Sequence, residues 1–403
     1  MPAPMGNVLL TTADGRRFLI AQLMDSLGGG LSSVVLPWLV LDAGGSGAEA
    51  GAAYLVSTVP YVLLGLPAGD VGDRHSRRRV MVVGAVAQLA AALIVPLVVI
   101  FGTEPSDLPL MVIYAAGLGV TAGRVFVDAA AFGAIARLVG EGHFVEGQAA
   151  LSFVWSMGLL IGPALGGALI GLVGAHNALW VQAAGFAVAI VLLSSMRADL
   201  GPGHDRPDSS DGLGAGLLIV VRNPMLRLLT AVGMAWNLAV NMIYALLVVF
   251  ARGELGAGGP ETGWMLAIGG GAGLVGGLSA PAVQRRFGIG LALRGALIAS
   301  AVAAVGMALS RDVVADTLAF SLLEGSGLLF ITLLIGQRQT LAGAHEQARV
   351  GITGRMAALL AATLGAMLAS ALVAHLPPSQ VFALAAGGTL LVAVSAQRLL
   401  RAV

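Results

Sequence analysis

Four ionisable side chains stand out within the long apolar stretches of this chain, where they could carry a proton or bind a charged group. They are Asp25, Arg124, Asp128 and Glu324. A charge at the centre of a membrane helix costs about 2.5–3.5 kcal/mol on insertion scales, so residues of this kind are candidates for function. Arg124 and Asp128 are spaced i, i+4 and can pair on one helix face, which favours a structural role. Asp25 and Glu324 remain as candidates for proton coupling.

Asp25 is the stronger candidate, because a buried carboxyl group can load and release a proton near neutral pH. It lies two turns into the first apolar stretch. The alternative is a carboxylate that is capped or lies at the membrane interface. Glu324 lies in a run of leucine, glycine and serine at 322–326, so it needs a partner or a water-filled cavity. It could carry a proton, bind a cationic group or pair with a neighbouring helix.

The composition is that of a membrane protein. Hydrophobic residues make up 57% of the 403 residues and charged residues 11%, whereas a soluble domain carries about 25% charged residues. The net charge of +1 gives no reason to expect a nucleic-acid partner. Cysteine is absent, and the six histidines lack the spacing of metal ligands. We therefore expect no metal site and no cofactor.

Twelve apolar stretches are long enough to cross a bilayer, for which about 20 residues suffice. Lipid offers the backbone no hydrogen-bond partner, so each stretch must be helical, and barrel strands would alternate instead. The fold class expected is an all-α polytopic membrane protein with 12 transmembrane helices. The expected limits are 18–41, 50–68, 80–101, 108–130, 147–173, 177–196, 225–250, 262–283, 289–309, 314–336, 352–374 and 379–398.

The distribution of arginine predicts the orientation. All 22 basic residues are arginine, and an amino terminus in the cytoplasm places 19 of them on the cytoplasmic side and only Arg252 and Arg311 outside. This is a strong positive-inside signal, and it places both termini in the cytoplasm. Arg338 and Glu346 lie where span ten leaves the membrane, and we expect both to be solvated.

The spans divide six and six at a hydrophilic segment, 197–211, whose Pro, Gly, Asp and Ser content is typical of a linker. We expect one six-helix bundle at 1–196, a cytoplasmic linker at 197–217 and a second bundle at 218–403. The halves match at two points with the same offset of 212 residues: GAEAG at 47–51 matches GPETG at 259–263, and GLPA at 65–68 matches GLSA at 277–280. Parallel repeats of this kind rock around a central site.

The same offset takes Asp25 to Asn237 in the seventh span. Asn237, Asn241 and Tyr244 follow at i, i+4 and i+7 and form a polar stripe on one helix face. We expect the acid in one half to face these amides in the other, across a central cavity.

Two local motifs stand out. The run GDVGDRHSRRR at 69–79 holds five charged side chains between Asp73 and Arg79, which cannot enter lipid, so it predicts a tight hairpin with a turn at Gly69 and Gly72. The run GLLIGPALGG at 158–167 places glycines four residues apart on one face and a proline in the helix. The glycines permit close helix approach, and proline removes a backbone hydrogen bond.

On these residues the chain resembles the major facilitator superfamily over essentially its whole length. The 69–79 run is similar to the signature loop between spans two and three, with Ser76 where glycine is usual and His75 where an aromatic is usual. The span-five run resembles the motif of proton-coupled antiporters, that is, exporters. The first span and the run Phe144…Ser152 are similar to the branch that holds macrolide-efflux and enterobactin-exporter proteins. The family acid of that branch would fall at Gly29, four residues after Asp25.

The resemblance implies a latch between the halves. Asp73 would face the end of span eleven, and Arg77 or Arg78 would pair with Asp128 at the cytoplasmic end of span four. The gating motif so implied is Gly69, Asp73, Arg74, Arg77, Arg78 and Asp128. The span-five motif, Gly158, Gly162, Pro163, Gly166 and Gly167, would be a kinked, small-residue helix at the seam between the halves. The alternatives are charges that only mark topology and ordinary helix packing.

The candidate lining of the cavity is largely apolar and aromatic, which suits small amphipathic molecules. It comprises Met24, Trp38, Tyr61, Trp155, Trp236, Asn237, Asn241, Tyr244 and Gln337. No phosphate-binding loop is present to use ATP, so the proton gradient would drive transport by a rocker-switch movement. An importer or facilitator of a metabolite and a non-transporting membrane sensor remain as alternatives, whereas no catalytic constellation suggests an enzyme. We expect a monomer in the bacterial cytoplasmic membrane.

Overall fold

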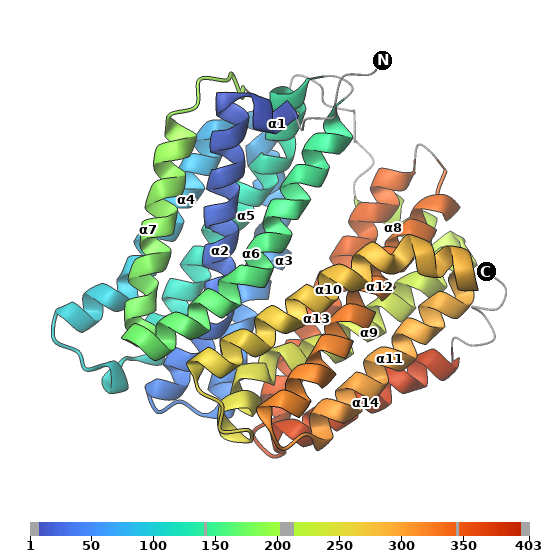
Figure 1. Ribbon diagram of the computed structural model, residues 1–403. Coiled ribbons are helices and arrows are strands. Elements are labelled where there is room, and N and C mark those ends of the chain that lie inside the picture. The colour runs from blue at the N-terminus through green and yellow to red at the C-terminus, as the bar shows by residue number, and fades with distance from the viewer. Residues whose placement is uncertain (1–7, 141–142, 202–212, 344–345, 396–403) are drawn as a thin grey trace. The chain divides into compact units, whose positions relative to one another are not determined.

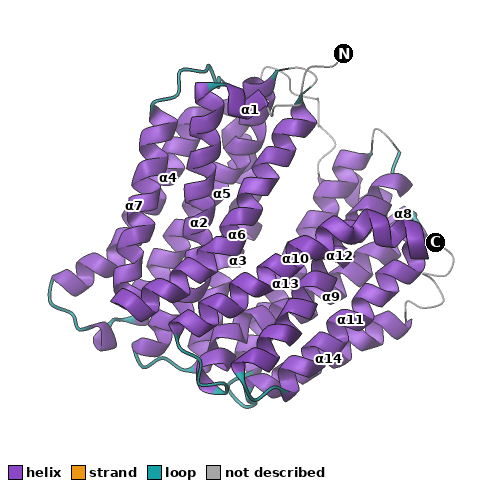
Figure 2. Ribbon diagram, in the orientation of Figure 1, coloured by secondary structure: helices purple, strands orange, loops and turns teal. Residues whose placement is uncertain are grey.

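The structure, a computed structural model, describes residues 8–140, 143–201, 213–343 and 346–395. Within these ranges every regular element is a helix (Figure 2). Eleven helices are long and apolar enough to cross a membrane, and the bent helix α3 makes a twelfth when its two parts count as one span. The all-helical, twelve-span prediction is thereby confirmed. The predictions for linker residues 202–212 and for Arg206, Arg398 and Arg401 lie outside the described residues.

The twelve long helices match the expected stretches one for one. They are α2 (Ala13–Asp42), α3 (Gly47–Arg74), α4 (Arg77–Ile100), α5 (Leu110–Val139), α6 (Phe144–Val173), α7 (Ala175–Ser194), α9 (Pro224–Gly253), α10 (Gly259–Phe287), α11 (Ile289–Leu309), α12 (Val313–Leu341), α13 (Gln347–Leu372) and α14 (Pro378–Ser395). The short elements are α1 (Val8–Thr11), η1 (Pro105–Asp107) and α8 (Leu213–Arg222). Helix α8, at the end of the expected linker, was not predicted.

Side chains at the helix starts satisfy amides that the helices leave unpaired. Thr12 accepts a hydrogen bond from the backbone N–H of Gly15 at the start of α2. Asn223 caps α9 through two backbone amides, and Asp312 caps α12 in the same way. The caps fix where these helices begin, within a few residues of the apolar limits.

The chain forms two compact units. Unit 1 comprises Met1–Ser46 and Val56–Arg206, and unit 2 comprises Gly47–Leu55 and Pro207–Val403. In unit 1, α2 packs on α6 and α7, and α4 packs on α5 and α7 (Figure 1). In unit 2, α10 and α11 pack on α12, and α9 packs on α13 and α14. The first turns of α3 are grouped with unit 2 and the remainder with unit 1.

The helix starts reproduce the internal repeat. Helices α10 and α11 begin 212 residues after α3 and α4, respectively, as the matching motifs indicated. The last three helices of the repeat, α12, α13 and α14, begin 203 residues after α5, α6 and α7. The difference arises because α4 is longer than α11 and because the link between α4 and α5, which contains η1, is longer than the link between α11 and α12. Helices α5 and α12 are therefore counterparts, as are α2 and α9.

Candidate functional site

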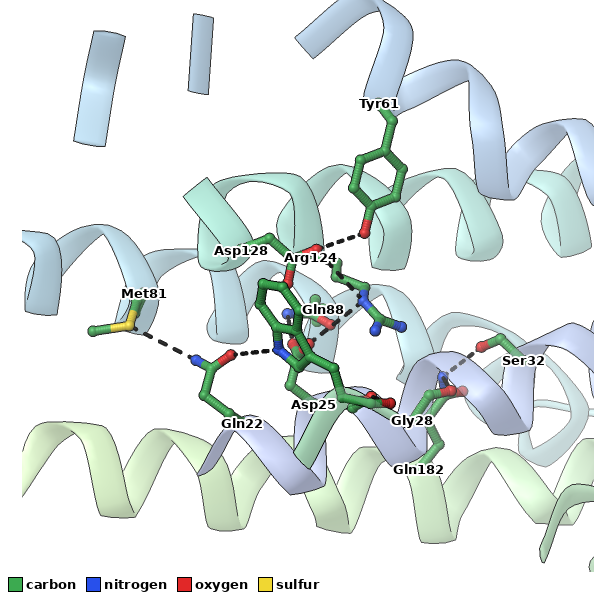
Figure 3. A network of polar contacts seen from close by, with 12 residues as sticks. Gln22, Asp25, Gly28, Ser32, Tyr61, Met81, Gln88, Arg124, Asp128 and Gln182 are labelled. Atoms are coloured by element: carbon green, nitrogen blue, oxygen red, sulfur yellow. Dashed lines mark hydrogen bonds and ion pairs between the residues drawn. The ribbon is translucent and has the colours of Figure 1, made fainter. Parts of the chain in front are cut away.

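Asp25 lies on the buried face of α2, where its side chain meets groups from α4 and α5 (Figure 3). The residue is only 2% exposed. Gln88 of α4 donates a hydrogen bond from Nε2 to Asp25 Oδ1 at 2.7 Å. Arg124 of α5 brings its Nε to 3.6 Å from Asp25 Oδ2. Asp25 is thus a buried carboxylate with a cationic and an amide partner.

Arg124 faces a second carboxylate on its own helix. Its Nε lies 3.9 Å from Asp128 Oδ2, which realises the i, i+4 pair that the spacing predicted. Tyr61 of α3 donates its hydroxyl to the same Asp128 oxygen at 2.7 Å. We call Asp25, Tyr61, Gln88, Arg124 and Asp128 the Asp25 cluster. It holds one more carboxylate than guanidinium, so a single proton would make it neutral.

A second polar group lies in unit 2 and centres on Glu324 of α12. Tyr244 of α9 donates its hydroxyl to Glu324 Oε1 at 2.5 Å. One turn earlier on α9, Asn241 accepts a hydrogen bond from Tyr54 at 2.8 Å. Glu324 is half-buried and, among the described residues, forms no ion pair with an arginine. One residue of the predicted stripe, Tyr244, therefore does contact an acid, but that acid is Glu324 of its own unit.

The aromatic side chains expected to line the cavity have different environments. Trp155 of α6 donates its indole N–H to Gln22 at 3.2 Å and packs edge-on against Phe132. Trp38 is buried in α2, and Met24 on the same helix is half-buried. Gln337 is half-buried on α12.

Trp236 belongs to the hydrophobic core of unit 2. It is 4% exposed, packs on Phe330 with ring centroids 5.3 Å apart and donates to Ser300 at 3.4 Å. Gly327 leaves the space that the indole fills within unit 2. The role of Trp236 in a central cavity stays a prediction.

The family model that matches the chain is that of the Major Facilitator Superfamily, over residues 18–353. The chain belongs to this superfamily. It is therefore a multi-pass membrane transporter rather than an enzyme.

Curated relatives that match the chain include multidrug efflux pumps. The pump Tap of Mycolicibacterium fortuitum is 29% identical over 306 residues, which cover 72% of this chain and 71% of the relative. Tap of Mycobacterium tuberculosis (strain ATCC 25618 / H37Rv) is 31% identical over 276 residues, or 66% of this chain and 64% of the relative. The chain is thus similar to drug-efflux members of the superfamily.

Solved structures of superfamily transporters share the fold. The nucleoside transporter NupG matches with a TM-score of 0.75 at 14% identity, over 95% of this chain and 98% of that one. A bacterial homologue of the iron transporter ferroportin matches with a TM-score of 0.72 at 18% identity, over 97% and 98% of the two chains. At these identities the match speaks for the fold alone.

The superfamily loop motif forms a tighter hairpin than its glycines suggested. Helix α3 continues to Arg74 and α4 begins at Arg77, so Gly69 and Gly72 are helical and the predicted turn there is wrong. The turn consists of His75 and Ser76. Gly72 instead lies beside the backbone of Ala129 and Ala130 in α5.

The arginines of the hairpin do not reach Asp128. Arg77 lies 3.9 Å from Asp73, and Arg74 pairs with Asp70 at 2.8 Å. Arg78 donates to the backbone oxygen of Met196. Asp128 was expected at the end of span four, but α5 runs on to Val139 and leaves it well inside the helix.

Asp128 therefore pairs with Arg124 and not with an arginine of the hairpin. Helix α5 extends past the limit that hydropathy indicates, so Asp128 lies too far inside the helix for the expected pair. The role of Asp73 in a latch stays a prediction.

The span-five glycines pack on α2 of the same unit. A Cβ at Gly158 would meet Ser26, one at Gly162 would come 2.7 Å from the Cα of Gly30, and one at Gly166 would meet Leu31. The close approach expected of this motif is therefore present, and the glycines serve the contact that presents Asp25 to its partners.

We expect Gly162→Leu to destabilise unit 1 by about 1–3 kcal/mol or more, because the atoms in its way are backbone atoms that cannot move aside. The free energy of unfolding in mixed micelles measures this. Gly295→Leu is the matched control, since a Cβ there meets nothing within 4 Å. Equal stability of the two variants would contradict the assigned packing.

Three buried glutamines of unit 1 were not singled out from the sequence. Gln22 joins Trp155 and Met81, Gln88 joins Asp25, and Gln182 donates to the backbone oxygen of Gly28 and to Ser32 at 2.8 and 2.6 Å (Figure 3). The sequence could have indicated them, because each lies within an apolar span and a buried amide needs hydrogen-bond partners.

In the efflux branch that the chain resembles, an acid would stand at position 29, where this chain has glycine. A Cβ at Gly29 would overlap the guanidinium of Arg124. Residues 25 and 29 are one turn apart on α2, so both face the same arginine. In this chain the acid stands at Asp25, and Gly29 leaves the space that the guanidinium occupies.

The burial of Arg338 shows that the predicted solvation of its side chain is wrong. Arg338 was expected in solvent, but it is 8% exposed and lies inside α12, which extends to Leu341. Glu346, by contrast, is exposed as predicted. In the parts of the chain that are described, no group of three acidic or histidine side chains could hold a metal ion.

Proposed function

We propose that the protein is a proton-coupled exporter of small amphipathic molecules that works by alternating access. The superfamily membership and the similarity to multidrug efflux pumps support transport and export. The observation that carries proton coupling is the charge balance of the Asp25 cluster. Two carboxylates, the buried Asp25 and the half-buried Asp128, share one guanidinium there, and the cluster lies within the helices of unit 1.

The geometry suggests a proton step at Asp25. In the unprotonated state, Arg124 holds both Asp25 and Asp128, and Gln88 holds the remaining oxygen of Asp25. A proton on Asp25 removes its attraction for Arg124 and leaves a neutral pair of Arg124 and Asp128. The contact between α2 and α5 is thereby weakened, and this couples the proton to movement of the helices.

The driving force would be the proton gradient, without a cofactor. A pH difference of one unit is worth about 1.4 kcal/mol per proton, which sustains roughly a tenfold substrate gradient for one-to-one exchange. A membrane potential of about 100 mV adds about 2.3 kcal/mol for each charge moved. We place the protein as a monomer in the bacterial cytoplasmic membrane with both termini in the cytoplasm, as the arginine distribution favours.

The proposal is tested in proteoliposomes with an imposed pH gradient. Ethidium, a macrolide and a siderophore are screened, and their accumulation is followed as the gradient is applied and then collapsed with a protonophore. We expect accumulation of at least one of them that disappears with the gradient. Transport that is insensitive to the protonophore would exclude proton coupling and favour a facilitator.

We propose Glu324 as a second carboxylate, which carries a proton or receives the cationic group of a substrate. Hydrogen bonds to a charged group contribute about 1.5–3 kcal/mol. If Glu324 receives a cation, Glu324→Gln should lower ethidium transport by roughly ten- to a hundredfold and leave transport of neutral chloramphenicol intact. If it carries the proton, the variant should lose gradient-driven transport of both.

Tyr244→Phe is the matched variant for Glu324, because it removes only the hydroxyl that bonds to the carboxylate. A smaller effect in the same direction is expected. Wild-type transport of both substrates by Glu324→Gln would remove Glu324 from the mechanism.

A further inference from the structure

The guanidinium of Arg338 lies between three helices of unit 2, in a space bordered by two glycines. It projects from α12 towards α9 and α13, where a Cβ at Gly233 would come 2.9 Å from its Nη2 and one at Gly354 would come 2.6 Å from its Nη1. Side chains larger than hydrogen at these two positions would displace the guanidinium. The glycines therefore leave room for a buried cation.

The guanidinium of Arg338 donates its hydrogen bond to an uncharged group. Its Nη2 donates to the backbone oxygen of Leu229 at 3.0 Å, and its Nε is buried without a hydrogen-bond partner. No acidic side chain of the described residues forms an ion pair with it. An arginine remains charged, and an unpaired buried charge is costly.

A cavity of about 300 Å³ lies beside the guanidinium. Its polar lining consists of Asn237, Arg338, Gln339 and Arg355, and leucine, isoleucine and alanine side chains complete the wall. Arg355 is exposed and adds a second positive charge to the lining. A volume of this size is at the lower end for ligand sites and suits a small molecule or one end of a larger one.

Arg124 of α5 and Arg338 of α12 lie on counterpart helices, at positions that are not equivalent, and only Arg124 has an acidic partner. In unit 1, Arg124 of α5 is neutralised by Asp25 of α2. In unit 2, the counterpart helix α12 presents Arg338 towards the counterpart helix α9. The position that corresponds to Asp25 there is Asn237, which lines the cavity but carries no charge. Unit 1 thus places a carboxylate beside its arginine, whereas the cavity lining of unit 2 places an uncharged amide near Arg338.

We propose that this cavity binds an anionic group, a carboxylate or a phosphate, with Arg338 as its principal ligand and Arg355 as a second positive charge. The apolar wall would receive a small apolar body attached to the anion. The group can belong to a soluble organic anion or to a phospholipid headgroup. This inference does not rest on proton coupling at Asp25, because the site lies in unit 2 and involves none of the Asp25 cluster.

The test uses the full chain in phosphatidylcholine nanodiscs, titrated with benzoate and with inorganic phosphate at constant ionic strength. Ligand that binds the folded state raises the melting temperature in a saturable way. We expect saturable binding by the wild type and at least tenfold weaker binding by Arg338→Gln. Arg311→Gln, which removes an exposed cation elsewhere in unit 2, should bind like the wild type.

Nanodiscs that contain phosphatidylglycerol separate the two sources. If the headgroup is the ligand, the apparent dissociation constant of benzoate rises at least tenfold in these nanodiscs, and the rise is absent in Arg338→Gln. If the ligand is soluble, the constant is unchanged.

Asn237→Asp is a second variant, needed in case Arg338→Gln does not fold. It keeps Arg338 and places a carboxylate in the cavity, as Asp25 does beside Arg124 in unit 1. It should also weaken binding at least tenfold. Equal binding by wild type, Arg338→Gln and Asn237→Asp, or no saturable effect of benzoate, phosphate and phosphatidylglycerol, would overturn the proposal.

Discussion

Replacement of Asp25 by asparagine should abolish gradient-driven export while leaving the protein able to exchange substrate. The amide can still accept the hydrogen bond from Gln88, but it cannot take up a proton. With a pH difference of one unit, the wild type should maintain roughly a tenfold substrate gradient for one-to-one exchange, and Asp25→Asn should reach a ratio near one. Counterflow of labelled substrate without a pH gradient should persist.

The measurement is substrate accumulation and counterflow in proteoliposomes, each followed across the neutral pH range and on both sides of it. Asp316→Asn is the control, since Asp316 is also a buried acid but lies in unit 2 and accepts a hydrogen bond from Ser310. It should retain accumulation and its pH dependence. Full, pH-dependent accumulation by Asp25→Asn would show that the proton is carried elsewhere.

Replacement of Arg124 by glutamine should produce the largest loss of stability among single substitutions in unit 1. Removal of one partner from a buried ion pair costs about 3–5 kcal/mol, because the other charge stays buried without compensation. Here two carboxylates, Asp25 and Asp128, lose their common cation. The loss should be greater in mildly alkaline than in mildly acidic buffer, because protonation at low pH removes the remaining charge.

The free energy of unfolding in mixed micelles, measured in both buffers, tests this expectation. Asp25→Asn combined with Arg124→Gln should recover part of the loss, since one of the two stranded carboxylates is gone. Gly29→Ala should act in the same direction more weakly, because its methyl group would displace the guanidinium from its place. Additive effects of the two substitutions in the double variant would show that Asp25 and Arg124 do not interact.

The hydrophobic pattern was sufficient to place the twelve helices. Lipid leaves the backbone no other partner than itself, so a sufficiently long apolar stretch must be a helix. The predicted helix ends were too early where arginines follow the apolar stretch. Helices α5 and α12 continue through Arg137 and Arg338, because a helix can extend beyond lipid or bury a charged side chain against its neighbours.

Contacts within one helix could also be predicted, because they depend only on the helical period. The pair Arg124–Asp128 and the stripe of Asn241 and Tyr244 are examples. Contacts between helices could not. Asp25 was expected to face amides of the other half, but the amide that it meets is Gln88, in the third span of its own half.

The sequence by itself determined that this protein is a twelve-span transporter of two related halves and that Asp25 and Glu324 are its unusual acids. Charge in an apolar stretch is rare for an energetic reason, and a linear sequence records it directly. Only the tertiary structure decided which charges are compensated. Arg124 has Asp25 and Asp128 beside it, whereas Arg338 lies in a glycine-lined space beside an uncharged asparagine. Compensation depends on the packing of helices far apart in the chain, which the order of residues does not state.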